Sequence, residues 1–289
     1  MCITGPSHVH TVTRLTVAED ATPVMGVTLL GDRIYVVFRE SNVIAVFTSH
    51  QPFRRLQDIV VHGLLWSTDI AASVNIVCLY VPDVRSYSVW RINVNNGAVV
   101  QWLTGLVAVS VSVTSEDRVV LLVMVHPHFD EGLPTWLGEV RMYSPEAVIE
   151  AVVKLSPDIT CPLSVIMTTR KTFIVSHGYR RHQMHRVCEV DMTGRVLKSF
   201  GSTHGNGVGQ LCTPYHVSLD DEKRVIVADS DNNRVLLLNK QLTSPRVLVT
   251  WRPQSDDDAR RPGRLHYDSH TGRLLVGLYS GHVDIYKLK

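Results

Sequence analysis

A ten-residue stretch, HGYRRHQMHR at 177–186, carries the densest group of ionisable side chains in the chain. Its three histidines, three arginines and one tyrosine suit the binding of a phosphate group, because guanidinium groups donate paired hydrogen bonds to anionic oxygens. Tyr179 or a guanidinium plane can also stack on a nucleobase. The positive charge of the stretch rises below about pH 6.5, where histidine takes up a proton. The stretch therefore predicts contact with an anionic partner.

The same histidines do not predict a metal site. The spacings from His177 to His182 and from His182 to His185 match no recognised set of zinc ligands, and the adjacent arginines repel a cation. The sequence contains no GxSxG nucleophile elbow, no phosphate-binding P-loop and no CxxC pair. We therefore expect no metal ion, no cofactor and no catalytic residue.

Composition limits the class of protein. The chain has 289 residues, a formal net charge of +2, 45% hydrophobic residues and 19% charged residues. These values favour a folded chain with a large core, and they exclude a domain-wide basic surface. Five scattered cysteines and a start without a basic or apolar leader favour a reducing, cytoplasmic location. No apolar run reaches the ~18 residues that a membrane helix needs, so no membrane contact is expected.

Strands must position these residues, because valine supplies about one residue in six and β-branched residues favour sheets. A turn followed by four to six apolar residues recurs at 31–38, 73–81, 116–125, 169–177, 222–229 and 271–278. A spacing of roughly 40–55 residues is typical of propeller blades. Each copy has a strand before it and another after it, and five copies have a more polar fourth strand. The sequence therefore predicts an all-β, six-bladed β-propeller with strands A to D in each blade.

The N-terminal segment is expected to close this ring. The sixth copy has no fourth strand after it, whereas residues 9–17 alternate between apolar and polar types and are not used by the first blade. They would supply the outer strand of the last blade and remove an open sheet edge. Residues 145–155 have a pattern compatible with a short helix, but they fall where a fourth strand is due. We expect a single domain over residues 1–289, monomeric in isolation.

Propeller geometry places the B–C loops together on one face, which we call the B–C face. The A–B turns lie on the opposite face and carry Asp32, Glu116, Asp117, Asp220, Asp221 and Glu222. The near-neutral chain is therefore expected to have one basic and one more acidic face, and a basic patch attracts an anionic partner. The predicted partner-binding residues of the B–C loops are Arg39, Arg85, His126, His128, Tyr179, Arg180, Arg181, His182 and His185.

Residues 209–240, GQLCTPYHVSLDDEKRVIVADSDNNRVLLLNK, resemble an NHL repeat. The matching positions are Gly209, Gln210, Leu211, Pro214, Asp229, Asn233, Arg234 and Val235. The other blades keep less of the pattern. The resemblance implies a six-bladed NHL propeller, as found at the C-terminus of tripartite-motif ubiquitin ligases, where it recruits substrate proteins or binds RNA. Within the motif, Asp229, Asn233 and Arg234 are expected to be structural, because an Asp–Arg pair can hold the Asn-rich turn.

Two functions remain open at this point. The first is a non-catalytic recognition platform that binds a protein or single-stranded RNA through the B–C face. It would be the substrate-recruiting module of a ubiquitin-ligase-type protein whose RING region lies outside this chain. The alternative is a metal-dependent propeller hydrolase or lyase with its site in the central channel. The predicted inner strands, such as DIAAS and VSVSV, are mostly apolar or small, and we expect few polar groups to converge there.

Overall fold

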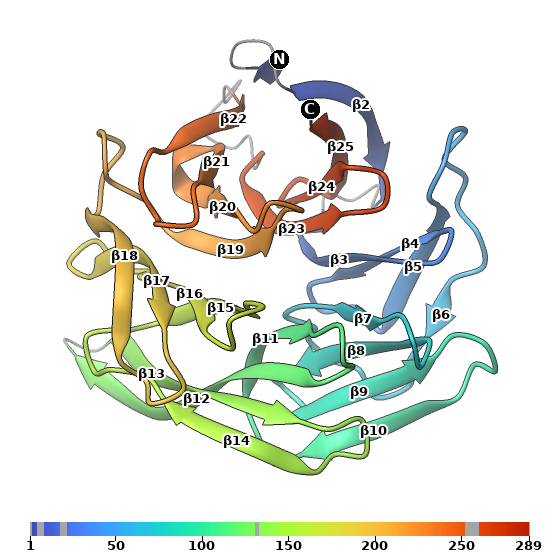
Figure 1. Ribbon diagram of the computed structural model, residues 1–289. Helices are drawn as coiled ribbons and strands as arrows, with labels where there is room; N and C mark the ends of the chain where they lie inside the picture. The colour runs from blue at the N-terminus through green and yellow to red at the C-terminus, as the bar shows by residue number, and fades with distance from the viewer. Residues whose placement is uncertain (1, 5–8, 18–21, 131–132, 252–259, 289) are drawn as a thin grey trace.

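Six antiparallel sheets stand as blades around a central axis (Figure 1), which confirms the predicted all-β propeller. The computed structural model describes residues 2–4, 9–17, 22–130, 133–251 and 260–288, and it describes their side chains except at 2–4, 9–12, 126–130 and 133–134. In each blade, strands A to D follow one another from the axis outwards. The A strands are β3 (Val24–Leu30), β7 (Ala71–Ser73), β11 (Ala108–Val113), β15 (Pro162–Met167), β19 (Pro214–Leu219) and β23 (Pro262–Asp268).

The remaining strands keep the same order of blades, from one to six. The B strands are β4 (Arg33–Phe38), β8 (Cys78–Asp83), β12 (Val119–Asp130), β16 (Phe173–His177), β20 (Val225–Asp229) and β24 (Arg273–Leu278). The C strands are β5 (Val43–Thr48), β9 (Ser88–Asn93), β13 (Leu133–Tyr143), β17 (Met184–Val190), β21 (Arg234–Leu238) and β25 (His282–Leu288). The D strands are β6 (Ile59–Val60), β10 (Val99–Thr104), β14 (Ile149–Lys154), β18 (Val196–Thr203), β22 (Arg246–Trp251) and β2 (Val9–Thr16).

The N-terminal strand β2 closes the ring, as the alternating pattern of 9–17 predicts. It pairs antiparallel with the C-terminal strand β25, from Val9 opposite Leu288 to Thr16 opposite His282. Arg14 strengthens this seam with two hydrogen bonds to Asp284, Nε to Oδ1 at 2.6 Å and Nη2 to Oδ2 at 2.7 Å. The sequence did not predict β1 (Cys2–Thr4), which pairs with β22 and gives blade five a fifth strand.

Blade three differs from the prediction that the segment with His126 and His128 is a B–C loop. Its strands β12 and β13 continue into this segment as a long hairpin and still pair at Asp130 opposite Leu133. The register shifts between Val125 and Pro127, and such a bulge accommodates a proline that cannot donate to the ladder. In the same blade, residues 149–154 form the outer strand β14, so the strand rather than the short helix is correct.

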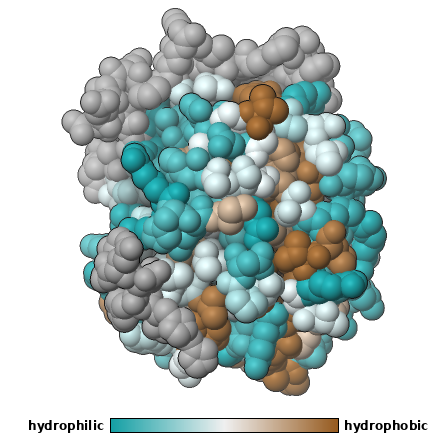
Figure 2. Space-filling model, turned by 90° about the vertical axis from the view of Figure 1, so that its left-hand side faces the viewer, coloured by the Kyte–Doolittle hydropathy of each residue, from teal (hydrophilic) through white to brown (hydrophobic). Residues whose placement is uncertain are grey.

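The core consists of apolar layers between neighbouring blades. One such layer joins Tyr35 and Val37 of blade one to Leu79 and Val81 of blade two. The layer between blades six and one also includes Leu15, on the closing strand. Towards the rim the burial alternates, and the side view mixes hydrophilic and hydrophobic surface (Figure 2). Each blade is therefore stabilised mainly by its two neighbours, and this makes closure of the ring important for stability.

One position of every A strand lies at a β-bulge beside the axis. The register shifts at this point in blades one and three to six, and the pairing of Ser67 with Asp83 ahead of β7 gives blade two the same shift. A bulge leaves backbone groups beside it unpaired within the sheet. The six equivalent positions are Gly26, Asp69, Ser110, Ser164, His216 and Arg264.

Side chains at these positions supply the missing partners across the blade interfaces. In four cases the side chain accepts a hydrogen bond from the backbone N–H that follows the equivalent position of the next blade. These bonds are Val111 N to Asp69 Oδ2 at 3.1 Å, Val165 N to Ser110 Oγ at 3.4 Å, Val217 N to Ser164 Oγ at 3.3 Å and Leu265 N to His216 Nδ1 at 3.4 Å. We call the side chains at these six positions, with the bonds they make between blades, the axial ring.

Arg264 completes the axial ring on the side of blades one and two. Its guanidinium is 3% exposed and donates through Nε to Met25 O at 2.7 Å and through Nη2 to Thr68 O. A Cβ at Gly26 would lie 2.7 Å from the side chain of Ile70, so blade one has no room for a side chain at its own position. Ser67 Oγ, which donates to Phe38 O at 2.7 Å, links blades one and two directly.

Candidate functional site

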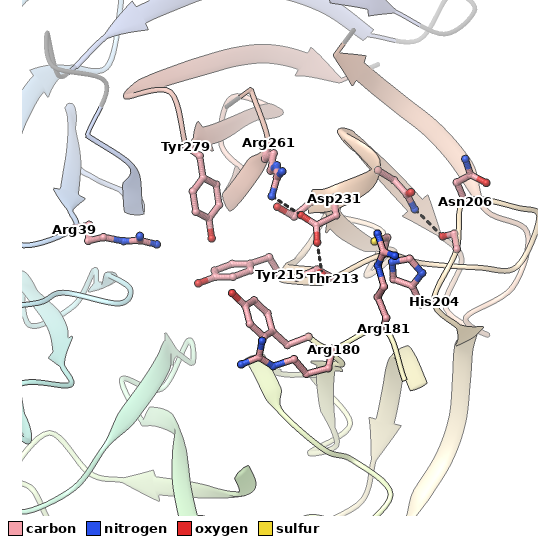
Figure 3. A pocket seen from close by; sticks show the side chains of 15 residues that line it. Arg39, Arg180, Arg181, His204, Asn206, Thr213, Tyr215, Asp231, Arg261 and Tyr279 are labelled. Carbon is pink, nitrogen blue, oxygen red and sulfur yellow. Dashed lines mark hydrogen bonds and ion pairs between the residues drawn. The ribbon is translucent and has the colours of Figure 1, made fainter. Parts of the chain in front are cut away.

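A cavity of about 790 Å³ opens on the B–C face (Figure 3). B–C loops and the loops between consecutive blades line it, drawn from blades one, four, five and six. Its ionisable and aromatic lining residues are Arg39, Tyr179, Arg180, Arg181, His204, Tyr215, Asp231, Arg261 and Tyr279. Figure 3 shows Arg39 facing Tyr215 and Tyr279 across the opening, with Asp231 and Arg261 on the far side of the tyrosines.

The B–C loop of blade four is held in shape from within. The Gln183 side chain accepts hydrogen bonds from the backbone N–H groups of Tyr179 and Arg180, both at 2.9 Å. Gly178 has φ +100°, and a Cβ there would lie 2.3 Å from Met184 O, so the loop requires glycine at this position. These contacts fix the backbone that presents Tyr179, Arg180 and Arg181 to the cavity.

His185 lies beneath this loop and not on its surface. It is fully buried, its Nδ1 accepts a bond from Thr213 N at 2.8 Å, and its Nε2 lies 2.9 Å from Arg180 O. With Nδ1 as acceptor, Nε2 carries the proton and donates to Arg180 O. The prediction that His185 contacts a partner is therefore wrong, because both ring nitrogens hold backbone groups of the site.

The structure brings together some of the predicted binding residues and separates others. Arg39, Tyr179, Arg180 and Arg181 line the cavity. Arg85 lies outside it, over the ring of Trp66 at 4.4 Å and 3.6 Å from Glu40. His182 is exposed beside the cavity. The side chains of His126 and His128 lie outside the described part of the chain, although their backbone belongs to β12.

Sequence reasoning missed the aromatic half of the site. Tyr215 lies at the start of an A strand and Tyr279 in the last B–C loop, and their rings meet edge to face at 5.7 Å. The Arg264 guanidinium lies over Tyr215 at 4.6 Å, and Arg39 lies over Tyr279 at 6.0 Å. The two arginines and the two tyrosine rings thus form one continuous series of contacts. Such contacts fix guanidinium planes without using their N–H donors.

The NHL-like turn of blade five has the expected kind of contacts. Arg234 Nε donates to Asp229 Oδ2 at 2.7 Å, and Asn232 Nδ2 donates to the same oxygen at 2.8 Å. Asn233 adopts a left-handed conformation, φ 51°, at the end of a short 3-10 helix, Ser230–Asn232. These bonds place Asp231 at the cavity, where it pairs with Arg261 at 2.9 Å.

On the opposite face, some of the carboxylates predicted to make it more acidic form ion pairs. Arginines of the same turns neutralise its carboxylates: Arg224 lies 2.6 Å from Asp220 and 3.2 Å from Glu222, and Arg118 pairs with Glu116. The prediction counted the acids of the A–B turns without the arginines that follow them in sequence.

The central channel also differs from the expectation of few polar groups. Asp69 is buried, its Oδ2 lies 3.5 Å from His216 Nε2, and its Oδ1 lies 3.7 Å from Arg264 Nε. These side chains belong to the axial ring and bond to neighbouring blades. Among the described residues, no group of three or more His, Cys, Asp or Glu is placed to hold a metal ion.

His177 gives a pH dependence that can be measured. Burial, reinforced by the Arg186 guanidinium whose Nε lies 3.2 Å from His177 Nε2, lowers the pKa of this histidine to about 3. An unfolded histidine has a pKa of about 6.5, so the unfolded chain binds the extra proton between these values and stability falls as the pH drops. We expect His177 to contribute a loss of about 2 kcal/mol between pH 6.5 and 4.5.

Urea unfolding of the wild type and of His177→Asn at both pH values tests this expectation. The variant, which has no ring to protonate, should lose less unfolding free energy on acidification than the wild type. Equal losses in the two proteins would contradict the assignment.

No protein-family model matches the chain. Protein lin-41 of Caenorhabditis elegans is 30% identical over 130 residues, which cover 40% of this chain and 11% of lin-41. The E3 ubiquitin-protein ligase TRIM71 of Rattus norvegicus is 52% identical over 42 residues, 14% of this chain and 5% of TRIM71. The chain therefore matches only a small part of the length of these relatives.

Solved structures share the fold at low sequence identity. Virginiamycin B lyase from Staphylococcus aureus has a TM-score of 0.66 and 8% identity, covering 97% of this chain and 100% of its own. A protein of unknown function from Bacteroides caccae has a TM-score of 0.59 and 14% identity, covering 84% and 81%. No helix among the described residues is long and apolar enough to cross a membrane.

Proposed function

Since this six-bladed ring is an NHL-type propeller, we propose that it is a non-catalytic recognition module that binds a protein or RNA partner through the B–C face. One observation carries the proposal. Arg39, Arg180 and Arg181 line a large cavity on that face, and no carboxylate among the described residues forms an ion pair with them. Cationic groups left without a counter-charge on a concave surface attract an anionic partner.

The two classes of partner rest on different features of the same face. Tyr179 is 45% exposed beside Arg180 and Arg181, and a base can stack on such a ring while the guanidiniums bind phosphate. Protein recognition rests on the cavity, which offers donors, acceptors and aromatic rings together. Because the relative TRIM71 is named as an E3 ubiquitin-protein ligase, a protein partner bound here would be a substrate recruited to a ubiquitin ligase, with the ligase activity outside this chain.

The alternative of a hydrolase or lyase rests on the fold shared with virginiamycin B lyase. A catalytic channel would need side chains free to act on a substrate. In this ring the buried Asp69 and the partly buried His216 are committed to hydrogen bonds between blades. We therefore place the function on the B–C face, acting as one domain and as a monomer. The four cysteines whose side chains the structure describes are buried and unpaired, which suits a reducing cytoplasm.

Charge reversal at the cavity provides the test. The double variant Arg180→Glu, Arg181→Glu should lose capture of the natural partner from a cell lysate, by at least about tenfold, because two attractions become repulsions. The matched control is Arg195→Glu, an exposed arginine on the opposite face, which should capture the partner as the wild type does.

Nuclease treatment of the lysate separates the two partner classes. Capture that disappears with nuclease identifies RNA, and its log affinity should then fall linearly with log salt concentration. Capture that survives nuclease identifies a protein. Unchanged capture by the Arg180/Arg181 variant would contradict the proposed function.

A further inference from the structure

Four polar groups face one another at the axial end of the cavity. Figure 3 shows Arg39 entering from one side, the hydroxyls of Tyr215 and Tyr279 in the middle, and Arg180 below them. They come from blades one, five, six and four, so the closed ring alone brings them together. We call this group the axial donor cluster.

The guanidiniums of the axial donor cluster hold unused donors. The Nε atoms of Arg39 and Arg180 are buried and have no hydrogen-bond partner among the described residues. Arg39 lies over the rings of Trp66 and Tyr279, and Arg180 lies over Tyr179 at 5.1 Å. These ring contacts orient both guanidiniums, and neither guanidinium hydrogen-bonds to a residue that the structure describes. The Nη groups of both arginines therefore remain available as donors to an oxygen-rich ligand in the cavity.

The tyrosines add neutral donors. Burial, together with the neighbouring Tyr215, raises the pKa of Tyr279 well above its usual value, so this phenol keeps its proton at neutral pH. A phenol that stays protonated donates a hydrogen bond to an anion. Asp231, the one acid among the described residues that line the cavity, accepts from Thr213 Oγ1 at 2.7 Å and pairs with Arg261. Its charge is thus compensated on the side away from Arg39.

Among the residues that the structure describes, Arg39, Arg180 and Arg181 form no ion pair with an acid. Four further arginines of the B–C face do pair with acids: Arg85 with Glu40, Arg186 with Asp158, Arg234 with Asp229 and Arg261 with Asp231. A nucleic-acid backbone is bound by cations repeated along a track, with one charge per phosphate. A single cluster of converging donors instead suits one compact anion with several oxygens.

We propose that the axial donor cluster binds the phosphate monoester of a phosphorylated side chain on a protein partner. A monoester presents three terminal oxygens and close to two negative charges, which two guanidiniums and two phenols can bind from different directions. A carboxylate offers two oxygens in a plane and one charge, and fills fewer of these donors. The proposal rests on the proposed function, because it requires the B–C face to be the binding face.

The direct test is a titration of the full chain with N-acetyl-phosphoserine N-methylamide, followed by ³¹P NMR. We expect saturable binding, and a loss of at least about tenfold in affinity in Arg39→Met and in Arg180→Met. Tyr279→Phe, which removes one hydroxyl and keeps the ring, should weaken binding severalfold. Arg195→Met, on the opposite face, should bind as the wild type does. Absence of saturable binding, or equal affinity in the wild type and both arginine variants, would overturn the proposal.

The natural partner supplies the second arm, in a lysate treated with phosphatase or with nuclease. Loss of capture after phosphatase supports the phosphate site. Capture that resists phosphatase but is lost in the Arg180/Arg181 reversal overturns the phosphate site and leaves the proposed function intact. Capture that is lost with nuclease but not with phosphatase identifies RNA as the partner and also overturns the phosphate site. Capture that persists in the reversal variant contradicts the proposed function itself.

Discussion

Deletion of residues 1–17 is expected to abolish the cooperative unfolding transition of this protein. The deletion removes β2 and with it the pairing to β25, the Arg14–Asp284 contacts and the buried side chains of Leu15 and Val17. Each buried aliphatic side chain contributes about 1.5–3 kcal/mol, and domains of this kind are stable by only about 5–15 kcal/mol in total. Thermal unfolding followed by circular dichroism measures the result.

The matched control is a deletion of residues 1–4, which removes β1 and leaves β2 in place. Blade five keeps its own four strands in that variant, so we expect a melting curve close to that of the wild type. A cooperative transition at the wild-type temperature after removal of 1–17 would contradict closure of the ring by β2.

Arg264→Met is expected to lower the free energy of unfolding by about 3–5 kcal/mol, the usual cost of breaking a buried charged network. The substitution keeps most of the aliphatic volume and removes the donors to Met25 O and Thr68 O. It also leaves the buried Asp69 with one fewer positive neighbour. For a chain of this length the melting temperature should fall by roughly 10 °C.

Two further variants identify the cause of that loss. Arg181→Met, at an exposed position outside the axial ring, should change stability by less than about 0.5 kcal/mol. Arg264→Lys keeps the charge without the planar fork of donors and should lie between Met and the wild type. A melting temperature of Arg264→Met within about 2 °C of the wild type would show that the axial ring does not stabilise the propeller.

Local patterns were enough to predict the blades. Apolar runs such as RIYVVF and RLLVGL follow their turns at a constant spacing, and the alternation in 9–17 identifies the strand that closes the ring. These features depend on neighbours in sequence. The long hairpin of blade three was missed because the prolines Pro127 and Pro134 are typical of a loop, although a bulge allows the strands to continue.

The axial ring and half of the cavity could not be predicted in this way. Asp69, Ser110, His216 and Arg264 have different chemistry and share only a register at the bulge, which becomes visible after the inner strands are aligned by their pairing. Tyr215 belongs to an expected strand, and only its position at the start of that strand brings it to the cavity. The three histidines of 177–186 suggested more surface charge than the structure has, because the side chains of His177 and His185 are buried.

The most direct test of the recognition function is hydrogen–deuterium exchange of the backbone amides, with and without the captured partner. If the partner binds the B–C face, exchange should be slower in the loops 178–183 and 204–213, which contribute lining residues to the cavity. The A–B turns 168–172 and 220–224, on the opposite face, should exchange at the same rate in both states. Protection confined to those A–B turns, with unchanged exchange around the cavity, would contradict the account.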